Sequence, residues 1–162
     1  NIEATIAHEF MHAIDDRIDR AVAENRHKGF YLWEAFVPED YYYTFTYYDD
    51  DGNLYDTYNR VLYTPSDPLS NEDINRIYFV DGYSTTFPLE DRARIFEHIA
   101  VDEELLNAFE SKNLMVKAEY MCAVIRDVFS CIDENDMPFW EKNVKKVSLQ
   151  YFIDNYKIEP KG

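Results

Sequence analysis

Apolar residues recur every three or four positions along the first part of the chain, from Ile2 to about Glu24. This spacing places them on one side of an α-helix, and no glycine or proline interrupts the segment. The sequence therefore predicts one long amphipathic helix. Its apolar positions are Ile6, Phe10, Ala13, Ile14, Ile18, Ala21 and Val22.

The middle of the chain has a different pattern. The apolar stretch from Phe30 to Pro38 fits either a helix or a strand, and we interpret it as a buried connection. A tyrosine-rich stretch, from about Tyr41 to Tyr63, has two β-rich runs around an Asp-Gly pair, which is a strong signal for a hairpin turn. The segment RIYFVDGY, residues 76–83, predicts a short strand that enters a turn.

Helical patterns return in the second half. Pro88 suits the first turn of a helix, and Leu89, Phe96 and Ile99 are expected to form the buried side of that helix. The fold class expected from all these elements is α+β, mostly helical, with a small antiparallel β-hairpin or sheet. Further helices are predicted over Glu103–Ser111, Val116–Cys131 and Ser148–Tyr156.

Composition limits the kind of protein. The 162 residues, 46% of them hydrophobic, are enough for a single domain, and no apolar run reaches the roughly 18 residues of a membrane span. The formal charge of −16 argues against nucleic acid as a partner and favours basic peptides. A solvated acidic surface that only keeps the protein soluble explains the same charge.

The two cysteines are not expected to form a disulfide. If Cys122 and Cys131 both lie on the predicted helix, they are about 13 Å apart along its axis, whereas a disulfide requires Cα atoms within about 7 Å. We expect two buried free thiols.

The predicted first helix contains a pair of histidines with metal-ligand spacing. Residues four apart lie one turn along a helix and about 40° around it, so His8 and His12 can share one metal ion. Glu9 lies beside them and can accept a proton from a metal-bound water without itself binding the metal. The HExxH pattern therefore predicts one zinc ion, whose bound water has a pKa of about 7. An exposed helix surface with a coincidental pattern is the alternative.

The third ligand must come from elsewhere, because Ile18 stands where a metzincin has its third histidine. The best source is the helix that begins near Pro88, in which Glu90 and Asp91 fall in the first turn and His98 lies further along. Asp15 follows His12 by three residues, so it either orients a ligand ring or pairs with the arginines near it.

These two segments resemble a known family. The stretch HEFMHAIDD, residues 8–16, is similar to the catalytic helix of zinc metallopeptidases of the anthrax lethal factor type. In that family a tyrosine precedes the glutamate ligand by seven residues and an alanine follows it by three, and Tyr83, Glu90 and Ala93 have this spacing. Arg94 stands where the family tends to have a second glutamate. The two blocks cover only residues 7–16 and 83–96.

The resemblance implies a gluzincin, which is a zinc peptidase with His8, His12 and Glu90 as metal ligands. Glu9 is then the general base, and Tyr83 donates a hydrogen bond to the oxyanion. Asp91 suits either a contact behind the ligands or a pair with Arg92 or Arg94. A histidine ligand, His98 in place of Glu90, is the minor alternative.

We therefore expect residues 1–162 to form a single zincin-like catalytic domain that hydrolyses a peptide or protein substrate. Because the sheet of a zincin precedes its motif helix, and Asn1 is not an initiator methionine, a fragment of a longer peptidase is expected. The rivals are a metal-binding module without catalytic activity and a plain helical interaction domain. The sequence leaves the cellular location unknown, and only the resemblance favours a secreted or cell-envelope bacterial protein.

Overall fold

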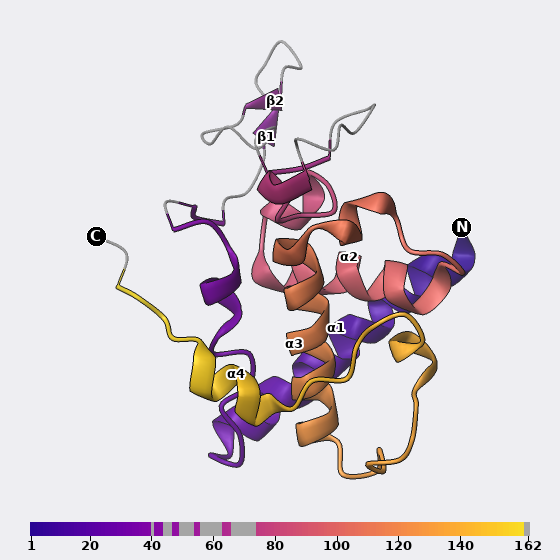
Figure 1. Ribbon diagram of the computed structural model, residues 1–162, viewed down its shortest axis with the longest axis vertical. Helices are drawn as coiled ribbons and strands as arrows, with labels where there is room; N and C mark the ends of the chain where they lie inside the picture. Colours follow the sequence, from indigo (N-terminus) through magenta and orange to yellow (C-terminus); the bar gives the residue numbers. More distant parts are fainter. Residues whose placement is uncertain (40, 44–46, 49–53, 56–62, 66–73, 161–162) are drawn as a thin grey trace.

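A computed structural model describes residues 1–39, 41–43, 47–48, 54–55, 63–65 and 74–160 of the chain (Figure 1). The described α-helices are α1 (Ile2–Ala23), α2 (Pro88–Val101), α3 (Lys112–Val128) and α4 (Leu149–Asn155). Short 3-10 helices connect them: η1 (Trp33–Phe36), η3 (Ile74–Arg76), η4 (Tyr83–Thr85), η5 (Asn107–Glu110) and η6 (Phe139–Glu141). The strands β1 (Tyr47–Tyr48) and β2 (Leu54–Tyr55) pair antiparallel.

The expected α+β class is wrong. In the described part of the chain the architecture is helical, and the two-residue strands are too short to form a layer of the fold. Pairing of Tyr47 with Tyr55 and of Tyr48 with Leu54 lies inside the predicted hairpin. The turn of that hairpin and most of its flanking residues lie outside the described residues.

The strand predicted over residues 76–83 is also absent from the described structure. Ile77 and Phe79 are buried as a strand pattern requires, but the described residues include no neighbouring strand that pairs with them. Their backbone groups have other partners: the Ser111 hydroxyl donates to the Ile77 carbonyl, and the Phe79 N–H donates to the Tyr63 carbonyl. The alternating buried residues here therefore belong to an irregular segment and not to a strand.

The long helix is confirmed, because α1 begins at Ile2 as predicted and ends one residue before Glu24. Asn1 caps its start by accepting a hydrogen bond from the Glu3 N–H. Asn25, which adopts a left-handed φ of 55°, follows its last turn and prevents the helix from continuing.

The buried face of α1 differs from the expected one. Ala7, Met11, Ile14 and Ile18 face the core, whereas Ile6 and Phe10 are exposed and line a shallow apolar hollow of about 450 Å³. Further along the chain, Pro88 begins α2 as expected. Leu89 is exposed, in contrast to the expectation, while Phe96 and Ile99 are completely buried.

Helix α3 lies at the centre of the molecule (Figure 1). It contacts α1, α2 and α4, and every residue from Tyr120 to Ile125 is buried, so this part of the helix is covered on all sides. Most of the connection over Phe30–Pro38 is buried as predicted, although Tyr31 and Glu34 are exposed, and its η1 turn packs against α3. Helix α1 packs along α2, and this contact brings the N-terminal motif next to residues from the second half of the chain.

The remaining predictions are partly correct. Only the 3-10 helix η5 forms within the helix predicted over Glu103–Ser111, and α3 ends at Val128 instead of Cys131. Both cysteines are free, as expected. Cys122 is buried but Cys131 is exposed, because the chain leaves the helix before it.

Candidate metal centre

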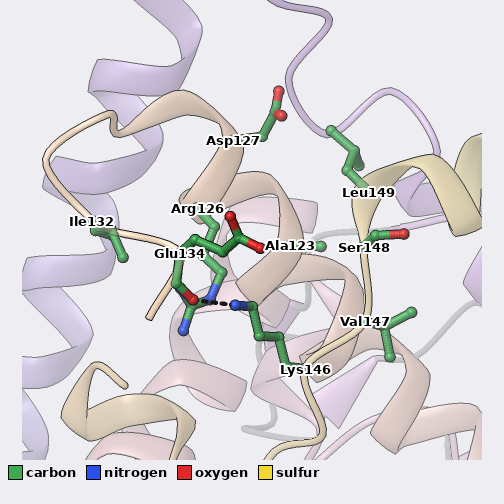
Figure 2. A pocket seen from close by; sticks show the side chains of 9 residues that line it. All are labelled: Ala123, Arg126, Asp127, Ile132, Glu134, Lys146, Val147, Ser148 and Leu149. Atoms are coloured by element: carbon green, nitrogen blue, oxygen red, sulfur yellow. Dashed lines mark hydrogen bonds between the residues drawn. The ribbon is translucent and has the colours of Figure 1, made fainter. Parts of the chain in front are cut away.

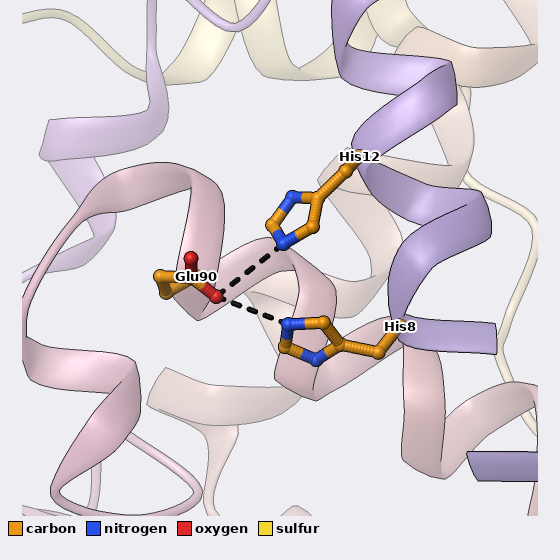
Figure 3. A group of neighbouring side chains, drawn as sticks. All are labelled: His8, His12 and Glu90. Carbon is orange, nitrogen blue, oxygen red and sulfur yellow. Dashed lines mark hydrogen bonds and ion pairs between the residues drawn. The ribbon is translucent and has the colours of Figure 1, made fainter. Parts of the chain in front are cut away.

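Three side chains from α1 and α2 converge on one point (Figure 3). The Nε2 atoms of His8 and His12 lie 3.1 Å and 3.4 Å from the same Glu90 oxygen, Oε2. The two imidazole rings are nearly perpendicular, with centroids 4.8 Å apart. In the described part of the chain, this is the one group of three His, Cys, Asp or Glu residues that can hold a metal ion.

The local sequence explains the convergence. Spacing of four residues places both histidines on the same side of α1, and Glu90 lies in the first turn of α2, which begins at Pro88. Direct packing of α1 against α2 then brings the glutamate opposite the rings. The side chains are 14%, 25% and 14% exposed for His8, His12 and Glu90, so the cluster can be reached from solvent.

The donor set suits a divalent zinc ion. Zinc binds imidazole nitrogens and carboxylate oxygens at about 2.0–2.2 Å in a tetrahedral arrangement, which separates neighbouring donor atoms by roughly 3.4 Å. The distance from His12 to the Glu90 oxygen equals this separation, and the distance from His8, which is also that of a hydrogen bond, is slightly shorter. Both histidines present the same ring nitrogen, and the carboxylate contributes the negative charge that a cation requires.

The two residues predicted to act in catalysis lie next to this cluster. Glu9 is exposed on α1, one residue beyond His8. Tyr83, in η4, is 52% exposed, and its ring centroid lies 6.2 Å from that of His8. Partial burial raises the pKa of the Tyr83 phenol, and the nearby carboxylates of Glu90 and Glu9 raise it further. The tyrosine is therefore protonated at neutral pH and can donate a hydrogen bond.

Asp15 contacts neither the metal-site rings nor the arginines of its own helix. Its Oδ1 accepts a hydrogen bond of 2.8 Å from Nε of Arg92 on α2, and its Oδ2 is buried without a hydrogen-bond partner among the described residues. Burial raises the pKa of Asp15 to about 6, although the Arg92 charge opposes this shift. Asp15 thus joins α1 to α2 behind the histidines.

Asp91 is completely buried and pairs with a lysine instead of an arginine. Lys117 Nζ, on α3, donates to its Oδ2 at 2.7 Å, and the Tyr43 hydroxyl donates to the same oxygen at 2.6 Å. Burial raises the pKa of Asp91 and lowers the pKa of Lys117, while their mutual attraction opposes both shifts. This pair fixes the turn of α2 that contains Glu90.

Glu97 is a residue of this region that the sequence reasoning missed. One of its carboxylate oxygens lies 3.5 Å from Nδ1 of His8, the ring nitrogen that faces away from Glu90. Arg94 binds the same carboxylate through its Nη1. A signal for Glu97 was present: it follows Glu90 by seven residues, or two helical turns, and therefore faces α1 as Glu90 does.

His98, the alternative ligand, lies elsewhere. Its Nδ1 is 2.7 Å from the Asp102 carboxylate at the end of α2, and it does not belong to the cluster.

The surface formed by the described residues has two further hollows besides the one lined by Ile6 and Phe10. One of about 330 Å³ borders the cluster and is lined by His8, Arg94 and Glu97 together with the first turns of α1. Another, of about 260 Å³, lies between the end of α3 and the start of α4 (Figure 2). Its cationic side chains already have partners, since Arg126 binds Glu141 and Lys146 donates to the Glu134 carbonyl.

Comparisons of the chain with protein-family models, with curated proteins and with solved structures find no match. In the part of the chain that the structure describes, no helix combines the length and the apolar composition needed to cross a membrane.

Proposed function

We propose that this protein is a zinc-dependent peptidase of the gluzincin kind. The observation that supports this proposal most directly is the approach of His8 Nε2 and His12 Nε2 to one oxygen of Glu90. These three residues would hold the metal. Zinc bound there supplies a Lewis acid that polarises a carbonyl group and lowers the pKa of a bound water to about 7.

The other residues of the site have separate roles in this proposal. Glu9 accepts the proton of the attacking water at its carboxylate and later gives that proton to the leaving amine. Tyr83 donates its phenolic proton in a hydrogen bond to the oxygen of the scissile carbonyl, where negative charge develops. Both side chains are exposed at the edge of the cluster, where a peptide can reach them.

The chemistry of the surroundings favours a basic peptide or protein as substrate. The chain carries a formal charge of −16, and Glu9 adds an exposed carboxylate beside the histidines, whereas Arg94 balances the charge of Glu97. Such a field attracts cationic segments and repels nucleic acid.

A metal-binding module without catalytic activity is the second candidate. One observation favours it: among the described residues, no hydrogen bond or ion pair fixes the exposed Glu9 carboxylate. Catalytic groups that are not preorganised contribute less to rate than fixed ones do.

Zinc content and peptide cleavage by the purified protein test the proposal. We expect close to one zinc per chain in the wild type and in Glu9→Gln, and loss of zinc in His8→Ala and His12→Ala. The wild type should hydrolyse a mixed peptide library, a control variant changed outside the site should do the same, and these three variants should not. Glu34→Gln, which changes an exposed glutamate on η1, is the matched control for Glu9→Gln. Equal cleavage by the wild type and Glu9→Gln would refute the mechanism. Full zinc in a wild type that does not cleave the library would support the second candidate instead.

A further inference from the structure

A chain of polar contacts links His8 to η4, the turn that contains Tyr83. Glu97 lies 3.5 Å from His8 Nδ1, and Arg94 binds Glu97 through Nη1. The same guanidinium donates from Nε and Nη2 to Oδ2 of Asp81, at 3.0 Å and 2.7 Å. Asp81 in turn accepts hydrogen bonds from the N–H and the hydroxyl of Ser84, which lies in η4.

We propose that Glu97 is a positioning residue for the metal ligand His8, and that Arg94, anchored by Asp81, keeps the Glu97 carboxylate in place. This inference rests on the proposed function, because it assigns a role to residues that contact a ligand of the proposed metal.

The tautomer of His8 gives the physical reason. A neutral imidazole has one N–H, and a metal ion on Nε2 requires that this proton be on Nδ1. The Glu97 carboxylate is the acidic group next to Nδ1, and its negative charge favours a proton there. A carboxylate next to the ring nitrogen that does not bind the metal also orients the imidazole and makes the metal-binding nitrogen a stronger ligand.

Arg94 is suited to hold this carboxylate. Its planar guanidinium has donors directed at two acids, Glu97 on its own helix and Asp81 before η4. Partial burial alone would lower the pKa of Arg94, but the two carboxylates raise it, so the residue is a permanent cation. Asp81 binds the guanidinium through Nε and Nη2, and Nη1 donates to Glu97. His8 is therefore supported through three residues that do not bind the metal themselves.

Zinc affinity, measured by competition with a chromogenic chelator, tests this role without depending on catalytic activity. We expect Glu97→Gln to weaken zinc binding by about 10- to 100-fold, the usual range for a partner of a metal ligand. Arg94→Gln should weaken it several-fold. Glu110→Gln, at an exposed glutamate in η5, is the matched control and should remain within twofold of the wild type.

A double-mutant cycle distinguishes positioning from a general loss of stability. If Arg94 acts through Glu97, then Arg94→Gln should have little further effect on zinc affinity once Glu97→Gln is present. Urea unfolding of the metal-free variants verifies that each is folded. If Glu97→Gln does not fold, Glu97→Asp, which keeps the charge on a shorter side chain, takes its place and should also bind zinc more weakly.

The outcomes separate the two proposals. Wild-type zinc binding together with unchanged affinity in Glu97→Gln would overturn this inference alone. Fully additive losses in the double variant would overturn the role of Arg94. Absence of zinc binding by the wild type would overturn the proposed function and this inference with it.

Discussion

The ammonium group of Lys117 on α3 lies 2.7 Å from the carboxylate of Asp91 on α2, and both side chains are completely buried. Lys117 also donates to the Tyr78 carbonyl at 2.6 Å, and its Nζ lies 3.8 Å from the centroid of the Phe79 ring. Asp91 immediately follows Glu90 in the sequence. The ion pair therefore joins the central helix of the fold to the turn that contains the third candidate ligand.

Removing one partner of this pair should strongly destabilise the protein. Lys117→Met leaves the Asp91 carboxylate buried without its cation, and we expect a loss of about 3–5 kcal/mol in the free energy of unfolding. Urea unfolding of the metal-free protein measures this loss, with the exposed Lys112→Met on the same helix as control. The double variant Lys117→Met/Asp91→Leu should recover part of the stability. A loss below about 1 kcal/mol in Lys117→Met would contradict this view of the pair.

Glu90 and His98 should behave differently in zinc binding. Because the Glu90 carboxylate is within 3.4 Å of both histidine Nε2 atoms while His98 pairs with Asp102, only Glu90→Ala should abolish high-affinity zinc binding. Metal titration followed by calorimetry measures both variants under the same conditions. Retained affinity in Glu90→Ala, with loss in His98→Ala, would show that the ligand assignment is wrong.

Tyr83→Phe should affect turnover and not metal content. Loss of one hydrogen-bond donor to a developing oxyanion typically lowers kcat by about 10- to 1000-fold. The half-exposed position of the ring predicts a change of less than about 1 kcal/mol in stability. Steady-state kinetics and zinc analysis of the same preparation measure the two effects. Unchanged kcat would leave Tyr83 without a catalytic role.

Asp15 should make the protein less stable as pH rises from about 4 to about 6. Burial raises its pKa in the folded state from 3.8 to about 6, so in this range the folded state binds a proton that the unfolded state has lost. That proton stabilises the fold at low pH, and the stabilisation, about 3 kcal/mol at most, is lost as pH rises through 6.

The comparison that tests this is urea unfolding of chelator-treated wild type and Asp15→Asn at several pH values. Other groups near Asp15, namely Arg92, Asp19 and His12, are present in both proteins. The difference in stability between the two proteins should therefore change between pH 4 and pH 6. A difference that is constant over this range would show that the carboxyl group does not titrate there.

Features that depend on neighbouring residues in the chain were predicted better than features that depend on contacts between distant segments. Helical spacing and a proline at position 88 are local signals, and they predicted α1 and the start of α2 correctly. The approach of Glu90 to the histidines was also expected, but only because a family resemblance supplied the spacing from Tyr83. Nothing in residues 24–87 alone predicts that α2 packs along α1.

Features that depend on tertiary packing were missed or misassigned. Asp15 was expected to act near its own helix, yet its partner Arg92 lies 77 positions away. Phe10 was expected to be buried because it is large and apolar, but the core takes the smaller Ala7 and the flexible Met11 instead. Residues 76–83 have strand-like alternation, and only the absence of a partner strand in the described structure shows that they are not a strand.

The candidate metal ligands come from two helices that are far apart in the sequence, and this affects how fast the metal site can form. Among the described residues, the candidate ligands come from α1 and α2, so the chain must close the long segment between these helices before His8 and His12 meet Glu90. Closing long loops is slow compared with forming a helix. Acquisition of tight metal binding during refolding would therefore report the moment at which α1 docks on α2, and not the earlier formation of either helix.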